Sequence, residues 1–181
     1  MVGMILEWPS SPGPHSSLGA HAETYARVIG SWHGELKNSL GGQTDSPVGV
    51  EIDFAWALAG PAVQDVWISP TREERARGTV ACLPMLDWYG TTIRLFDVKT
   101  QTWRATWCNA MTGGRIDLEG TRQGDDIVQI GVRQGRPIRW TFTDIRADSF
   151  VWRAHVLELD GDTWRLEVEI RAHRSNTRVD V

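Results

Sequence analysis

Hydrophobic and polar side chains alternate along most of this chain. After residue 31, ten segments place apolar residues at every second position, which is the period of a β-strand with one buried face. In the last segment Trp164, Leu166, Val168, Ile170 and Ala172 alternate with charged residues. The pattern therefore predicts a protein made mainly of β-strands. The predicted strands are residues 32–37, 50–58, 63–68, 91–96, 102–109, 115–119, 127–132, 138–144, 150–157 and 164–172.

The same alternation assigns side chains to the two faces of each strand. It places Arg165 and Glu167 on the outer, charged face of the last strand and Arg174 on its inner face. It also places Asn109 and Asp144 at the ends of inner, apolar faces. The interior is therefore expected to be apolar, with a few polar groups near the strand ends.

One segment before the strands has helical spacing. Apolar residues recur every three or four positions between residues 18 and 29, Ser17 precedes them as an N-cap, and Gly30 ends the run. The turns between the strands are rich in Gly and Asp, which suit short hairpins, and a long meander tends to close so that no edge is exposed. We therefore expect an all-β fold: a single antiparallel up-and-down β-barrel of about ten strands, with one N-terminal helix capping an end.

The remaining segments define the expected domain organisation. Residues 1–16, rich in Pro, Gly and Ser, are expected to form a flexible N-terminal arm, residues 17–174 one barrel domain, and residues 175–181 a C-terminal tail. Within the barrel, residues 70–90 are a long connection that begins charged and ends apolar. Long connections in compact domains are often functional, and a lid is expected here.

Charge and cysteine content narrow the possible partners. The net charge is −4 and the basic residues are dispersed, so no nucleic-acid-binding face is expected. Neither an export signal nor a membrane-spanning apolar stretch is recognisable, so a cytoplasmic protein without membrane attachment is expected. Cys82 and Cys108 are expected to be reduced structural thiols, with a disulfide as the minority alternative. A homodimer stays open.

The composition stands out in one respect, because the chain has ten tryptophans and only two tyrosines. A buried Trp contributes a large apolar area while its ring N–H still needs a partner, which suits the wall of a pocket. Ten strands favour space inside the barrel, although an interior packed solid by these rings is the alternative. The candidate ligand-binding residues are Trp56, Trp67, Trp88, Tyr89, Arg94, Trp107, Asn109, Trp140 and Trp152.

Three features together resemble the calycin superfamily: a helix that leads into Gly30-Ser31-Trp32, a meander of strands, and Arg174 on the last strand. In that superfamily the first strand carries G-x-W and the last carries an Arg that packs over the Trp. The segments GSWHGEL, RLFDVKTQTWRATW and GDDIVQIGVRQGRPIRWTF are similar to bacterial lipocalin-like barrels related to nitrobindin and fatty-acid-binding proteins. The resemblance implies a structural plug of Trp32 and Arg174 at a closed end and a ligand cavity at the other.

Two functions of different class remain open. The first is binding of a small, mostly apolar or aromatic molecule among the tryptophans, with Arg94, Asn109 and Asp144 orienting it. The alternative is a cofactor-independent cyclase or isomerase in the same cavity, with Asp65 and Asp144 as candidate catalytic acid or base groups and Arg94 as a charge partner. Whether the chain is an enzyme is not decided by these residues.

No metal site or cofactor is expected, because the five histidines form no cluster with ligand-like spacing. Haem is a minor alternative. It requires an inward His near the C-terminus, and His173 qualifies only if the last strand is bulged or ends before it.

Overall fold

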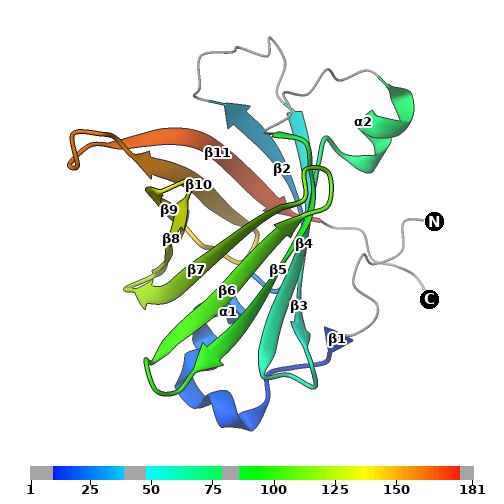
Figure 1. The fold of residues 1–181 in the computed structure, drawn as a ribbon. Coiled ribbons are helices and arrows are strands. Elements are labelled where there is room, and N and C mark those ends of the chain that lie inside the picture. Colours follow the sequence, from blue (N-terminus) through cyan, green and yellow to red (C-terminus); the bar gives the residue numbers. More distant parts are fainter. Residues whose placement is uncertain (1–9, 39–47, 79–85, 176–181) are drawn as a thin grey trace.

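The computed structural model describes residues 10–38, 48–78 and 86–175. Ten antiparallel strands, β2 to β11, form a closed barrel in which each strand pairs with the next along the chain and β11 pairs back with β2 (Figure 1). The predicted fold class and all ten predicted strands are thus confirmed. The strands are β1 (Ser10–Ser11), β2 (Gly30–Asn38), β3 (Val48–Ala57), β4 (Ala62–Ser69), β5 (Trp88–Asp97), β6 (Thr102–Asn109), β7 (Gly114–Gln123), β8 (Asp126–Arg133), β9 (Arg136–Thr143), β10 (Ser149–Leu157) and β11 (Trp164–Arg174).

The N-terminal helical segment covers one end of the barrel, as expected, but it is not one continuous helix (Figure 1). A 3₁₀ segment, η1 (Ser16–Ala22), leads into a single α-helical turn, α1 (Glu23–Ala26). Gly19 adopts φ 50° and ψ −132°, which interrupts helical geometry. The N-cap is His15 and not Ser17, because the His15 side chain accepts a hydrogen bond from the Ser17 backbone. The expected helical segment is therefore present, but it extends over residues 16–26 in place of 18–29 and is interrupted at Gly19.

The connection from β4 to β5 contains a second helix, α2 (Arg72–Arg77), beside the opposite end of the barrel (Figure 1). Thr71 and Glu74 form a capping box at its start. Glu74 also accepts a hydrogen bond from the Gly49 backbone at 3.1 Å, which ties the helix to β3. Residues 79–85 of the expected lid, with Met85 and Cys82, lie outside the described residues. Trp88, at the other end of this connection, is the first residue of β5.

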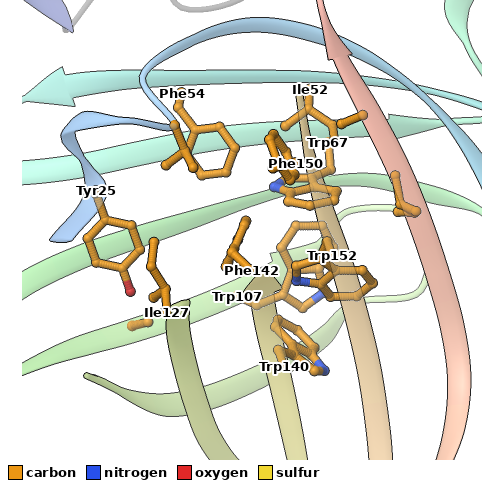
Figure 2. Packing of buried hydrophobic residues seen from close by; sticks show 14 of the residues in the cluster. Tyr25, Ile52, Phe54, Trp67, Trp107, Ile127, Trp140, Phe142, Phe150 and Trp152 are labelled. Carbon is orange, nitrogen blue, oxygen red and sulfur yellow. The ribbon is translucent and has the colours of Figure 1, made fainter. Parts of the chain in front are cut away.

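The barrel is packed solid at the end covered by η1 and α1. Tyr25 enters from α1 and makes an edge contact with Trp103, at 5.1 Å between ring centroids. Trp32 makes the corresponding contact with Phe150 at 4.8 Å. Figure 2 shows Tyr25 and Ile127 at one side of the buried cluster, with the tryptophans at the other. Aromatic rings in edge geometry thus fill the base of the barrel.

Arg174 lies over Trp32 at this base, as the resemblance implied. The guanidinium carbon is 4.0 Å from the ring centroid, and the side chain donates hydrogen bonds to the carbonyls of Ile29 and Ala147 at 2.9 and 2.6 Å. Gly30 makes this approach possible, because it adopts φ 122° and a Cβ there would overlap the guanidinium. The Gly of the G-x-W motif therefore serves the packing of Arg174, while the Trp32 ring N–H donates to the Val28 carbonyl at 2.8 Å.

A β-bulge reverses the faces of the first residues of β11. Ala154 of β10 pairs with Val168, but the next residue, His155, pairs with Leu166, so Glu167 is an extra residue. Glu167 and Val168 consequently both point into the barrel, and Arg165 does so as well. The expectation that Arg165 and Glu167 face outward is therefore wrong.

The same bulge turns the first residues of β11 the other way. Trp164, expected inside, lies on the outer face and stacks with Arg139, whose guanidinium carbon is 4.5 Å from its ring centroid. Leu166, opposite His155, also faces outward. Among the described helices, none is both long and apolar enough to span a membrane.

Candidate ligand-binding cavity

The half of the barrel away from η1 and α1 encloses a cavity of about 720 Å³. Its walls come from β4 to β11, and its outer part is formed by the β6–β7 and β8–β9 turns, which contribute Thr112 and Gln134. Pockets that bind small molecules in proteins are typically ~300–1,000 Å³. The cavity therefore has the size of such a site, and it opens at the end that the helical segment does not cover.

Five tryptophans form much of the cavity wall. Neighbouring rings contact one another edge-on or tilted, with centroid separations of 5.2 Å for Trp67 and Trp152 and 5.5 Å for Trp140 and Trp152. Figure 2 shows Trp107, Trp140 and Trp152 gathered on one side of the cluster. The wall is completed by Trp88, at 6.5 Å from Trp107. These contacts fix the ring planes, so the aromatic surface is preformed.

Glycine at position 90 makes room for this wall. Gly90 pairs with Asn109 in β6, and a Cβ at Gly90 would overlap the ring of Trp107. The Trp107 ring can therefore lie across β5 without displacing the strand.

Seven of the nine candidate ligand-binding residues line the cavity, and two do not. Trp56 is buried in the core and lies outside the cavity lining. Tyr89 is 41% exposed on the outside of β5, where the Arg75 guanidinium lies 5.9 Å from its ring centroid. The lining candidates are Trp67, Trp88, Arg94, Trp107, Asn109, Trp140 and Trp152.

Asn109 is held by the backbone at the mouth of the cavity. Its Nδ2 donates to the Asp87 carbonyl at 3.1 Å, and its Oδ1 accepts from the Met111 backbone at 3.0 Å. Arg75 supports the same region, since it donates to the carbonyls of Ser69 and Trp88 at 2.6 and 3.1 Å. The chain leading into β5 is therefore held in place by side chains that hydrogen-bond to main-chain groups.

An ion pair lies at the floor of the cavity. Arg94 Nη2 is 2.6 Å from Asp65 Oδ2, and both residues are almost fully buried. The other carboxylate oxygen of Asp65 accepts a hydrogen bond from the Thr92 backbone at 2.7 Å. Arg94 lines the cavity, whereas Asp65 lies behind it and outside the lining. The pair therefore presents the guanidinium, and not the carboxylate, to a ligand.

Tyr25 reaches the floor from the helical segment. The Arg94 guanidinium carbon is 5.0 Å from the centroid of the Tyr25 ring. Burial raises the pKa of Tyr25 to about 12, against the opposing effect of Arg94. Gln129 on β8 also lies close to the Tyr25 hydroxyl, and both groups lie against Gly120, where a Cβ would be 2.7 Å from the hydroxyl oxygen. Gln129 is not among the candidate residues expected from the sequence; it is buried on β8, on the same face as Ile127.

The second candidate carboxylate, Asp144, lies outside the cavity. It follows the end of β9, is exposed, and adopts φ 51° in the turn to β10. The expectation that Asp144 faces inward is therefore wrong, because the strand ends at Thr143 and the alternation does not extend past it.

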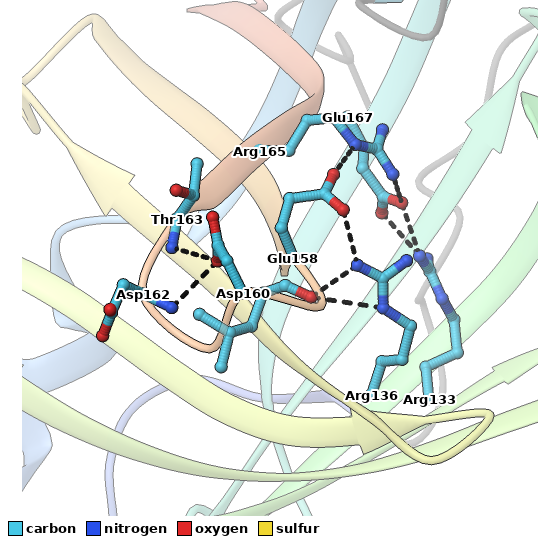
Figure 3. Close-up of polar contacts among 9 residues, drawn as sticks. Arg133, Arg136, Glu158, Asp160, Asp162, Thr163, Arg165 and Glu167 are labelled. Carbon is cyan, nitrogen blue, oxygen red and sulfur yellow. Dashed lines mark hydrogen bonds and ion pairs between the residues drawn. The ribbon is translucent and has the colours of Figure 1, made fainter.

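Charged residues form the rim of the cavity, among them Arg165 and Glu167, which were expected on the outer face (Figure 3). Arg133 Nη2 is 2.6 Å from Glu167 Oε2, and Arg136 Nη2 is 2.9 Å from Glu158 Oε2. Arg165 also pairs with Glu158. Hydrogen bonds from Arg165 and Arg136 lower the pKa of Glu158. Three guanidinium groups therefore face two carboxylates at the rim.

The described histidines lie away from this cavity. His33 and His173 are exposed and pair across β2 and β11, and His155 is on the outer face of β10. Burial and the neighbouring Arg139 and Arg153 lower the pKa of His155. His173, on which the haem alternative depends, does not point into the barrel.

Comparison with solved structures identifies the fold. The chain is similar to an S-type phycobiliprotein lyase, CPES, from Guillardia theta, with a TM-score of 0.56 and 12% sequence identity over 86% of this chain and 93% of that one. No protein-family model matches, and no curated protein gives a significant match. The likeness shows a shared fold, and Gly30, Trp32 and Arg174 lie in this barrel as the resemblance to the calycin superfamily implied.

Proposed function

We propose that this protein binds a small, mostly apolar and aromatic molecule inside the barrel. The observation that carries the proposal is the cavity of about 720 Å³ bounded by five tryptophans. A flat aromatic ligand gains both buried apolar area and ring contacts on such a wall. Because the rings already hold one another in place, little side-chain ordering is required when the ligand binds.

Binding is better supported than the cyclase or isomerase alternative. Asp144 is exposed in a turn, and Asp65 is engaged by Arg94 and the Thr92 backbone behind the cavity lining. An acid or base must reach the reacting proton, and neither of these two carboxylates lines the cavity. No residue role is taken from the lyase of similar fold. The proposed function is supported by the residues that line the cavity.

A fluorescent apolar probe tests the proposal. We expect saturable binding, measured by the rise in probe emission and by quenching of tryptophan emission. Replacing Trp140 with Leu removes one wall of the cavity and is expected to weaken binding about 10-fold, because about 1.4 kcal/mol of aromatic contact corresponds to that factor.

The matched control is Trp164→Leu, the same change on the outer face of β11. This variant is expected to keep the affinity of the unchanged protein. Absence of saturable binding, or equal losses in the two variants, would contradict a ligand site between the tryptophans.

A further inference from the structure

The floor of the cavity contains buried polar atoms without a hydrogen-bond partner among the described residues. They are Nε and Nη1 of Arg94, both side-chain amide atoms of Gln129, and the Tyr25 hydroxyl. Arg94 and Gln129 line the cavity, although the two residues are only 1% and 0% exposed. Buried polar groups in proteins nearly always have a partner, because leaving one unpaired is costly. Because Tyr25 lies outside the cavity lining, the atoms available to a ligand are those of Arg94 and Gln129.

The geometry brings these atoms to one place. Gln129 pairs with Gly120 in β7, and a Cβ at Gly120 would lie 2.7 Å from the Tyr25 hydroxyl and 3.5 Å from Gln129 Cγ. Arg94 lies over the Tyr25 ring. The missing side chain at Gly120 thus lets Tyr25 and Gln129 meet beside the Arg94 guanidinium.

The charge of this site is already balanced. Asp65 Oδ2 lies 2.6 Å from Nη2 of Arg94, so the buried ion pair is neutral overall. Nε and Nη1 of the same guanidinium have no hydrogen-bond partner among the described residues. A ligand carboxylate would add a second buried negative charge beside Asp65, which desolvation and like-charge repulsion oppose. A carbonyl oxygen accepts the same hydrogen bonds without adding charge.

We infer that Arg94 and Gln129 bind a neutral carbonyl oxygen at the inner end of the ligand. This inference rests on the proposed function, since the aromatic body of the ligand lies among the tryptophans. The ligand class it indicates is an aromatic ketone, quinone or amide, in preference to an aromatic or fatty acid. Gln129 Oε1 additionally accepts a hydrogen bond from an N–H or O–H next to the carbonyl.

Three probes with one aromatic body test the inference: propionyl-dimethylaminonaphthalene, dimethylaminonaphthoate and dimethylaminonaphthalene itself. Dissociation constants are measured by energy transfer from tryptophan. We expect the ketone to bind about 10-fold more tightly than the parent compound, the factor that one well-made buried hydrogen bond supplies. The carboxylate is expected to bind no more tightly than the parent.

The outcomes separate the two proposals. If none of the three probes binds, the proposed function fails. If the parent binds but the ketone gains nothing, or the carboxylate binds most tightly, the cavity binds aromatic ligands and the carbonyl site is overturned. Equal affinity for parent and ketone would mean that water satisfies these polar atoms.

Two variants test the residues themselves. Gln129→Met keeps the side-chain length and removes the amide, so the ketone is expected to lose most of its advantage while the parent compound binds as before. Gln123→Met, at the exposed end of β7, is the control for this substitution. An unchanged ketone advantage in Gln129→Met would overturn the assignment.

Asp65→Asn tests the charge argument. The asparagine keeps an oxygen for the Thr92 backbone but leaves the Arg94 charge uncompensated. The ratio of carboxylate to ketone affinity is then expected to rise about 10-fold, as a buried charge-assisted pair replaces repulsion. An unchanged ratio in the folded variant would contradict neutralisation by Asp65. If the variant does not fold, Gln129→Met and the three probes still decide the inference.

Discussion

The two halves of this barrel are built by the same strands but packed in opposite ways. At the base, Tyr25, Trp32 and Phe150 fill the interior with edge contacts. Toward the mouth, rings such as Trp107 and Trp140 surround a cavity at inward positions of β6 and β9. At the base η1 and α1 insert Leu18 and Tyr25 between the strands, whereas in the cavity half Leu86, just before β5, is part of the cavity lining. Whether a barrel of this strand number is solid or hollow therefore depends on what covers its ends, and not on alternation alone.

The base should respond to substitution mainly through stability. Trp32→Ala leaves a cavity beside Phe150 and removes the surface on which Arg174 lies, so we expect the free energy of unfolding to fall by about 3–5 kcal/mol. Urea denaturation measures this loss. The affinity of the folded fraction for an apolar probe is expected to stay unchanged. Weakened binding at normal stability would show that the base belongs to the ligand site.

Tyr25 allows the packed base to be tested by pH. Its pKa is raised from 10.0 to about 12 by burial, so the unfolded chain loses this proton first as the pH rises. The stability associated with the neutral phenol is present below pH 10 and decreases through the interval up to about 12, by as much as about 3 kcal/mol. Unfolding measured by urea across this interval should show the decrease.

Tyr25→Phe removes the ionisation and is the control for that experiment. Its stability is expected to change less with pH across the same interval, and absorbance at alkaline pH should lose the late-titrating phenol. If the variant and the unchanged protein follow the same curve, the Tyr25 hydroxyl is not held in the desolvated base.

The ten strands could be predicted because each has one buried face. In β10, Phe150, Trp152, Ala154 and Val156 are buried and alternate with partly exposed residues without interruption. The same periodicity brings Trp67, Trp107, Trp140 and Trp152 to the cavity wall. Alternation reports a local property, namely which side of a strand faces the interior, and it succeeds where the strand is regular and only one of its faces is apolar.

Other features depend on pairing with distant residues and could not be predicted in this way. Apolar and charged residues alternate without a break around Glu167, so the local sequence does not indicate a bulge. The bulge arises because Ala154 and His155 of β10 pair with Val168 and Leu166, which leaves Glu167 without an opposite residue. For this reason alternation places Arg165 and Glu167 on the outer face, although both line the cavity at its rim. Asp144 was misplaced because the end of β9 is set by the turn to β10. Gln129 could not be identified from alternation either, because Val128, Ile130 and Val132 favour the opposite face of β8, although Ile130 and Val132 are exposed.

Arg174→Ala is expected to have a smaller effect than Trp32→Ala. The arginine makes one cation–π contact and hydrogen bonds to main-chain carbonyls, and its side chain is only partly buried, so the expected loss is about 1–2 kcal/mol. Arg171→Ala, an exposed position on the outer face of the same strand, is the control and is expected to change stability little. Thermal denaturation distinguishes them. Equal effects of the two substitutions would mean that the contact with Trp32 does not stabilise the base.

A substitution at the rim is expected to have the smallest effect on stability, and to change mainly the rate at which a charged ligand associates. Arg165 is partly exposed and pairs with Glu158, so Arg165→Ala is expected to change stability by only about 0.5 kcal/mol. Because it removes one of three rim guanidinium groups, it is expected to slow the association of an acidic probe about 2–3-fold at low salt, an effect that screening abolishes at high salt. Stopped-flow fluorescence measures the rate.

Arg139→Ala makes the same change in net charge on the outer side of the barrel wall, where Arg139 stacks on Trp164. If the rim cluster guides acidic ligands to the mouth, only Arg165→Ala slows association, because screened charges act over about 10 Å at moderate ionic strength. If both variants slow it equally, the acidic probe responds to the net charge of the whole protein. The rim would then serve to hold the β8–β9 and β10–β11 turns together, and the difference between the two halves of the barrel would be one of packing alone.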